Sequence, residues 1–197
     1  MKLRYLLAAS ALCLPFTAAN AAEGISYNYA EASYQVWTDS KAHSWALKGS
    51  YQVADQAYLV AEDNYYFGMR SGGVGFFLPI EDNLHAYGQI ALGDSNDGIR
   101  PILEGGARFA LNDQLELRGA LRYVADAYGK NSAGSDFNFD LDFDDDDDWG
   151  GNGDKDEIFI QLEALYKLDS RIGFTGALTI PSEADGVVLN LGARFSF

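Results

Sequence analysis

The last eleven residues of the chain, Val-Val-Leu-Asn-Leu-Gly-Ala-Arg-Phe-Ser-Phe (187–197), alternate in polarity from one residue to the next. One parity carries Val187, Leu189, Leu191, Ala193, Phe195 and Phe197, and the other carries Val188, Asn190, Gly192, Arg194 and Ser196. A period of two places successive side chains on opposite faces of a β-strand. The stretch therefore predicts a strand whose two faces meet different environments.

The same alternation recurs along the chain in segments of about ten residues, and no helical spacing of apolar residues is sustained. Short polar clusters at 54–56, 81–83, 112–114 and 169–171 read as tight hairpin turns, and they alternate with longer breaks. This pattern predicts an all-β chain of ten strands, with eight as the fallback if 57–66 and 72–80 do not both cross. The expected strands are 25–37, 44–53, 57–66, 72–80, 84–92, 101–111, 115–125, 157–168, 172–180 and 186–197.

The N-terminus has the organisation of a secretory signal. Lys2 and Arg4 precede an apolar run, and Ala19-Asn20-Ala21 supplies small residues at the cleavage site. We therefore expect residues 1–21 to be removed during export through the Sec pathway, leaving 22–197 as one domain. Cys13, the only cysteine, would leave with the signal, so no disulfide is expected.

The chain is acidic, with 29 acidic residues against 14 basic ones and a formal net charge of −15. Such a chain has no affinity for phosphate backbones, so nucleic-acid binding is excluded. Beyond the signal, no run reaches the length of about 18 apolar residues that a spanning helix needs.

Charged residues of both signs fall on the polar faces of the expected strands, with Glu31 joining them. In a soluble barrel this face would point to water, whereas in a transmembrane barrel it would fill the lumen. Alternation alone fits both. The signal, the contrast between short turns and long loops, and aromatic residues near strand ends (Trp37, Trp45, Tyr58, Tyr123, Tyr166 and Phe195) favour the membrane. The expected lumen network comprises Lys48, Glu104, Arg108, Glu116, Arg118, Arg122, Glu163, Lys167 and Arg194.

The terminal octapeptide, through Asn190, Gly192, Phe195 and the final Phe197, resembles the assembly signal of bacterial outer-membrane barrels. The layout resembles the small OmpA/OmpX-like barrels of Gram-negative bacteria. The start of the mature chain (22–29) is similar to xanthomonad-type small barrels labelled as surface signalling or immunity-eliciting proteins. The resemblance implies a closed antiparallel up-and-down transmembrane β-barrel in the cell outer membrane, with short periplasmic turns and longer extracellular loops. It also implies membrane lipid, lipopolysaccharide, periplasmic chaperones and the barrel assembly machinery as partners, and it carries over no functional residues.

The segment 126–156 is the chain's compositional peculiarity, with eleven acidic residues against Lys130 and Lys155. Clustered carboxylates on a Gly-rich turn suit calcium, although the Gly and closing Glu of a calcium loop are missing. A solvated acidic loop is the alternative, and cations bridging the loop to lipopolysaccharide lie between the two. The candidate ligands of a weakly bound Ca²⁺ are Asp144, Asp146, Asp148, Asn152, Asp154 and Asp156; no other cofactor is expected.

Three classes of function follow. The leading hypothesis is a non-enzymatic surface barrel that acts through its loops in adhesion, envelope integrity or recognition of a partner or ion. The alternative is a small porin-like channel for ions or small solutes. A hydrolase at the rim would need His43 with Asp39 or Asp63, and the sequence offers little support for it.

Overall fold

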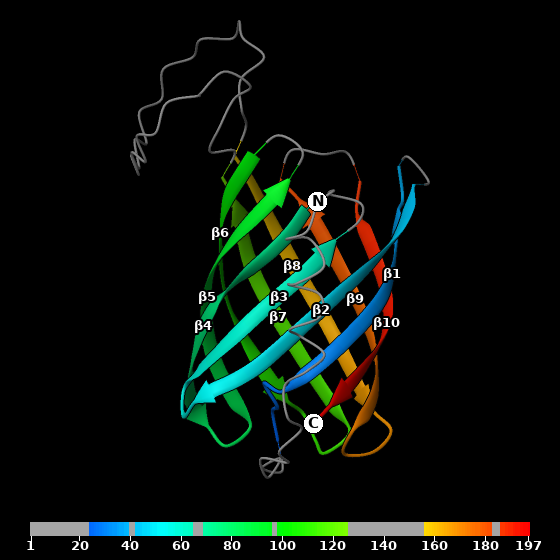
Figure 1. Ribbon diagram of the computed structural model, residues 1–197. Coiled ribbons are helices and arrows are strands. Elements are labelled where there is room, and N and C mark those ends of the chain that lie inside the picture. The colour runs from blue at the N-terminus through cyan, green and yellow to red at the C-terminus, as the bar shows by residue number, and fades with distance from the viewer. Residues whose placement is uncertain (1–23, 40–41, 65–68, 96–97, 126–155, 183–185) are drawn as a thin grey trace, which may run out of the picture.

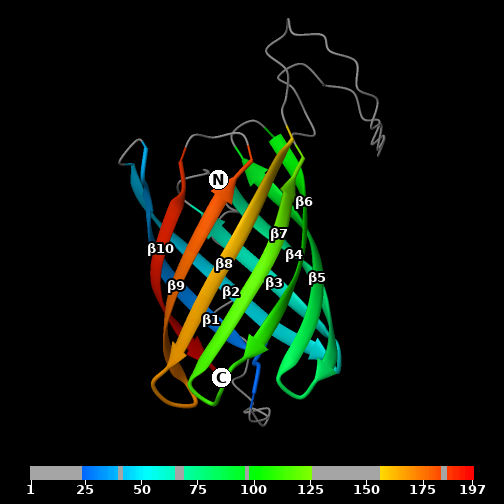
Figure 2. The same ribbon diagram turned by 180° about the vertical axis from the view of Figure 1, so that it is seen from behind.

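Ten antiparallel strands form a closed barrel in the computed structural model, which describes residues 24–39, 42–64, 69–95, 98–125, 156–182 and 186–197. Each strand pairs with its sequence neighbours, and β1 pairs with β10 to close the sheet (Figures 1 and 2). The strands are β1 (Tyr29–Trp37), β2 (His43–Ala54), β3 (Ala57–Asn64), β4 (Met69–Glu81), β5 (Leu84–Ser95), β6 (Gly98–Ala110), β7 (Leu115–Val124), β8 (Glu157–Lys167), β9 (Ile172–Pro181) and β10 (Val188–Ser196).

The architecture confirms the predicted ten-strand up-and-down barrel, and the eight-strand fallback is not needed because β3 and β4 both belong to the wall. Four tight turns lie at one end of the barrel, where β1 begins and the chain ends (Figure 1). We call this the tight-turn end, and the opposite one the long-connection end. No helix in the described part of the chain is long and apolar enough to cross a membrane.

The first strand was predicted too long. It was expected from residue 25, but the structure begins it at Tyr29, whose partners are Ser50 on β2 and Ser196 on β10. Residues 24–28 leave the wall although their polarity alternates, because Tyr27 is buried inside the barrel with 3% of its surface exposed.

Outside and inside of the barrel are inverted relative to a soluble protein. Large apolar side chains cover the outer surface: Leu191 is 72% exposed and Phe76 is 63% exposed, whereas Glu116 on the inside is 2% exposed. Hydrocarbon tolerates such an exterior and cannot hydrogen-bond an open sheet edge, which the closed barrel does not have. The outward set includes Trp45, Leu47, Val74, Leu78, Ile90, Leu92, Leu121, Leu162 and Phe174.

Only part of the set of aromatic residues near strand ends lies on the outer surface, where a membrane interface would meet them. Trp45, Tyr166 and Phe195 are exposed on the outside. Trp37 and Tyr58 are buried, with 6% and 3% of their surfaces exposed, so the prediction was wrong for them. Their parity puts them on the inner face, and position near a strand end does not override parity.

The β8–β9 turn is held by a carboxylate. Asp169 Oδ1 accepts hydrogen bonds from the backbone N–H groups of Arg171 and Ile172, each at 2.7 Å. These two bonds lower the pKa of Asp169 from its ordinary value, because they favour the charged form. In the β6–β7 turn, Asn112 Oδ1 makes the equivalent bonds to the N–H groups of Gln114 and Leu115 at 2.9 Å.

This difference predicts a local pH dependence. A carboxylate with a lowered folded-state pKa stabilises the fold above its unfolded pKa, and that contribution is lost as the pH falls through the folded value. We expect the amides of Arg171 and Ile172 to lose protection from hydrogen exchange on acidification, measured by NMR after correction for the intrinsic pH dependence of exchange. Leu115, held by the uncharged Asn112, is the internal control. Equal responses in the two turns would contradict the assignment.

Candidate functional site: the lumen

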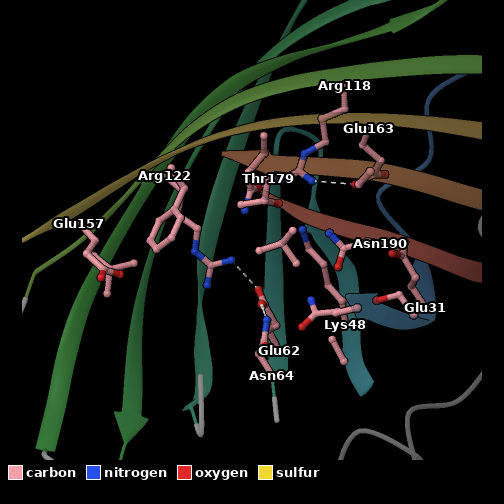
Figure 3. Close-up of a pocket in the computed structure, with 18 of the residues that line it drawn as sticks. Glu31, Lys48, Glu62, Asn64, Arg118, Arg122, Glu157, Glu163, Thr179 and Asn190 are labelled. Carbon is pink, nitrogen blue, oxygen red and sulfur yellow. Dashed lines mark hydrogen bonds and ion pairs between the residues drawn. The ribbon is translucent and has the colours of Figure 1, made fainter. Parts of the chain in front are cut away.

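A cavity of about 120 Å³ occupies the half of the lumen nearest the long-connection end. Its lining residues come from β1–β3 and β6–β10, and Figure 3 shows the labelled side chains pointing into the same space. Four acidic and four basic residues line it (Glu31, Glu62, Glu157, Glu163, Lys48, Arg100, Arg118 and Arg122), so their formal charges cancel. Hydroxyl and amide groups provide the uncharged polar surface: Ser33, Gln35, Asn64, Gln161, Thr179 and Asn190.

A ladder of alternating charges runs around one wall at the floor of this cavity. We define the central ladder as Glu31, Arg194, Glu163, Arg118 and Glu104, which lie on β1, β10, β8, β7 and β6. Glu163 accepts from Arg118 Nη1 at 2.9 Å and from Arg194 Nη2 at 2.5 Å. Arg194 Nε also donates to Glu31 at 2.8 Å, and Arg118 Nη2 donates to Glu104. Since every charge has an opposite neighbour, the ladder can remain ionised away from bulk water.

Two tyrosines complete the ladder. The Tyr87 hydroxyl donates to Glu104 at 2.9 Å and accepts from Arg118 Nε at 2.6 Å. The guanidinium of Arg194 lies over the ring of Tyr29, 4.2 Å from its centroid. A cation over an aromatic face is favourable, and the planar guanidinium suits this stacking. These contacts fix the arginine side chains in place, so the ladder is a rigid part of the wall.

An ion pair between described residues spans the lumen. Arg122 on β7 donates from Nη1 to Glu62 on β3 at 2.9 Å, and these strands lie on opposite sides of the closed barrel (Figure 3). Lys48 on β2 lies beside this pair, in register with Glu62 on one neighbouring strand and with Glu31 on the other. Glu62 forms its ion pair with Arg122, and Glu31 forms its ion pair with Arg194. Lys48 thus presents its ammonium to the cavity without an ion pair of 4.0 Å or less among the described residues.

The other half of the lumen, toward the tight-turn end, is filled. Arg108 on β6 donates from Nε to Glu116 on β7 at 2.7 Å, and Lys167 Nζ lies 3.7 Å from Glu116 Oε2. Aromatic and small apolar side chains pack around this group into a core of Tyr27, Tyr58, Val60, Phe77, Tyr87 and Ala120, with Ile25 against it. The residues at 24–28 thus contribute to the interior of the barrel.

All nine residues of the predicted lumen network lie on inward positions, six in the region of the cavity and central ladder and three (Arg108, Glu116 and Lys167) near the tight-turn end. The structure also assigns their pairing, which the sequence left open: Glu104 contacts Arg118, and Glu116 contacts Arg108. The predicted lumen network lacked Glu62. It shares parity with Tyr58 and Val60 on β3, so extending the alternation through that strand would have found it.

Five of the six candidate calcium ligands fall outside the described residues. Asp144, Asp146, Asp148, Asn152 and Asp154 lie outside the described residues, as does most of 126–156 and the predicted signal at 1–21. Asp156 is described, and its Oδ2 accepts a hydrogen bond from the Tyr123 hydroxyl at 2.6 Å. Within the described ranges, no group of three or more His, Cys, Asp or Glu side chains is placed to hold a metal ion.

His43 and Asp63, which the rim hydrolase hypothesis would combine, do not form a catalytic pair. His43 is exposed, and its ring lies 5.8 Å from that of Tyr34. Asp63 pairs with Arg70 at 3.2 Å. The arrangement at this rim is that of surface side chains with local partners.

The four residues of the predicted assembly signal have different environments. Asn190 lines the cavity, and Phe195 lies on the outer surface. The ring of Phe197 stacks on that of Tyr51 with centroids 6.4 Å apart. Gly192 lies where a Cβ atom would come within 2.7 Å of the carbonyl oxygen of Ala32, so only glycine fits without a shift of the backbone.

Two substitutions separate folding from assembly at this terminus. We expect Gly192→Ala to lower the free energy of unfolding by about 1–3 kcal/mol, the usual cost of overpacking, when the protein is refolded in detergent. Phe197→Ala should refold there with little loss but should reduce insertion in cells if the terminus is an assembly signal. Denaturant titration and the amount of barrel in outer-membrane fractions measure the two effects. Equal behaviour of the two variants in both assays would contradict this separation.

No family model matches the chain, and no curated protein matches it. The barrel is similar to solved structures of outer-membrane porins. The NanC porin superposes with a TM-score of 0.57 at 12% identity, over 85% of this chain and all of that one. The KdgM porin superposes with a TM-score of 0.47 at 11% identity, over 86% of this chain and 99% of that one. At such identity, the likeness to NanC shows the fold.

Proposed function

We propose that this protein is a small outer-membrane channel for small polar solutes, exported to the periplasm and oriented with its tight-turn end toward it. The observation that carries the proposal is the polar cavity inside a barrel whose exterior is apolar. A barrel that served only as an anchor would be more stable with a packed interior, because cavities cost stability. The likeness of the fold to a porin supports the same choice.

The balanced charges of the cavity suggest the kind of solute. Arg118 and Arg122 are paired with Glu163 and Glu62, so the amides, the hydroxyls and the Lys48 ammonium are among the groups that a solute can meet. Such a lining favours neutral or zwitterionic polar molecules over strongly charged ones, since no large net field selects either sign.

Single-channel recording in planar bilayers tests the proposal. The chain from residue 22, refolded and inserted, should give discrete ohmic openings, and a variant lacking residues 22–27 should do so as well. Silence of both proteins, with folding verified by the heat-dependent shift of gel mobility typical of membrane barrels, would overturn the channel.

The filled half of the lumen favours a second candidate, a closed barrel that presents its loops at the cell surface. In that case the acidic segment 126–156 would contact lipopolysaccharide or a partner, with weakly bound calcium between anionic groups. Neither candidate involves catalysis. Recording with and without millimolar calcium distinguishes them, because a loop-based function predicts silence and calcium-dependent binding to lipopolysaccharide.

A further inference from the structure

The N-terminal segment, residues 24–28, enters the lumen at the tight-turn end. The segment meets the wall of the barrel at Asn28. The N–H of Phe197 donates to the carbonyl of Asn28 at 3.1 Å, and β1 starts at Tyr29. Asn28 is anchored through its Oδ1, which accepts from the N–H of Gln52 on β2 at 2.7 Å. Upstream of Asn28 the chain turns away from the sheet, toward the interior.

Two long cationic side chains hold the backbone of this segment from inside the barrel. Arg108 Nη1 on β6 donates to the carbonyl of Ser26 at 2.9 Å. Lys167 Nζ on β8 donates to the carbonyl of Gly24 at 2.8 Å. Arg108 and Lys167 also form ion pairs with Glu116, so neither cation depends on the segment for an anionic partner.

Tyr27 packs against the side of the wall that β3 to β6 form. Its ring stacks on Phe77 of β4 with centroids 4.1 Å apart and planes 9° from parallel. The guanidinium of Arg108 covers the ring, 4.5 Å from its centroid. Tyr58 lies against it at 4.9 Å, and only 3% of the Tyr27 surface is exposed.

We propose that residues 24–27 form a plug that closes the lumen at the tight-turn end and gates the channel by withdrawing from it. Asn28 keeps its bonds to Phe197 and Gln52 as the hinge, so withdrawal of residues 24–27 breaks none of the hydrogen bonds between strands. The segment is held by two hydrogen bonds from Arg108 and Lys167 and by the ring contacts of Tyr27, which cost far less to break than a strand of the wall. Arg108 and Lys167 keep their ion pairs with Glu116 when the segment leaves. This inference rests on the proposed channel function.

The test compares single-channel currents of the chain from residue 22 with those of Tyr27→Ala. Loss of the buried ring should raise the ratio of open to closed time about tenfold, because a ring of this size contributes most of the apolar contact of the plug. Tyr34→Ala is the matched control. Tyr34 is another tyrosine near the N-terminus, on β1, but its ring packs on Trp45 and not on the residues around Tyr27. A chain starting at residue 28 removes the plug without changing the wall and should be constitutively open.

The outcomes separate the gate from the channel. More open time in Tyr27→Ala and in the shortened chain, with Tyr34→Ala unchanged, supports the plug. Openings of equal frequency and size in all four proteins would overturn the plug and leave the channel standing. Silence of all four, with folding verified by gel mobility, would overturn both.

Discussion

Arg118→Met is expected to lower the free energy of unfolding by about 3–5 kcal/mol, the usual cost of removing one partner from a buried ion pair. Arg118 contacts two carboxylates, Glu104 and Glu163, and the Tyr87 hydroxyl. Methionine would leave Glu104, which is 4% exposed, with a buried charge and no cation in contact. Urea titration of the protein in lipid vesicles, followed by tryptophan fluorescence, measures the loss.

Two further variants show whether the loss of unfolding free energy comes from the unpaired carboxylate of Glu104. Arg118→Met combined with Glu104→Gln should recover part of the stability, because it removes the carboxylate that lost its contacting cation, whereas Glu163 keeps Arg194. Arg171→Met, in the exposed β8–β9 turn, should change the free energy of unfolding by less than about 0.5 kcal/mol. A single Arg118→Met variant as stable as Arg171→Met would contradict the role given to the central ladder.

Lys48→Glu is expected to shift the ion selectivity of the open channel toward cations by about tenfold. The cavity lining is balanced, so this substitution gives it a net formal charge of −2. Each unit charge acts with about 1 kcal/mol at 4 Å in water, and salt reduces the sum. The reversal potential in a salt gradient measures the shift, recorded in the chain that starts at residue 28.

A matched control for Lys48→Glu lies outside the lumen. Arg70 is 65% exposed in its side chain and pairs with Asp63 near the long-connection end. Arg70→Glu makes the same change of charge, and we expect it to leave the reversal potential near that of the parent. Equal shifts in the two variants would mean that the potential responds to net charge and not to the cavity.

The sequence predicted the wall of this barrel well because alternation is a local property. Each inward position on β10, from Val188 to Arg194, is set by parity alone, and the same rule placed Arg118 and Glu163 in the lumen. Register between neighbouring strands then brings these charges together, and register depends on closure of the whole sheet. This is why alternation alone does not predict the pairing of Glu104 with Arg118.

The N-terminal segment shows where local reasoning fails. Residues 25–28 alternate like the strand that follows, so periodicity extended β1 through them. Their place is decided by long-range contacts, such as the stack of Tyr27 on Phe77, fifty positions further along the chain. Trp37 and Tyr58 were misplaced because proximity to a strand end was used where parity decides.

Reactivity of paired cysteine variants toward a charged, membrane-impermeant thiol reagent tests the division between watery lumen and lipid-facing surface most directly. The only native cysteine, Cys13, belongs to the predicted signal, so the chain from residue 22 contains no other thiol that could react. Asn190→Cys, in the cavity lining, should react, whereas Leu191→Cys, on the adjacent outward position, should be protected by lipid. Fast reaction at 191 and protection at 190, in protein inserted into vesicles, would contradict the account.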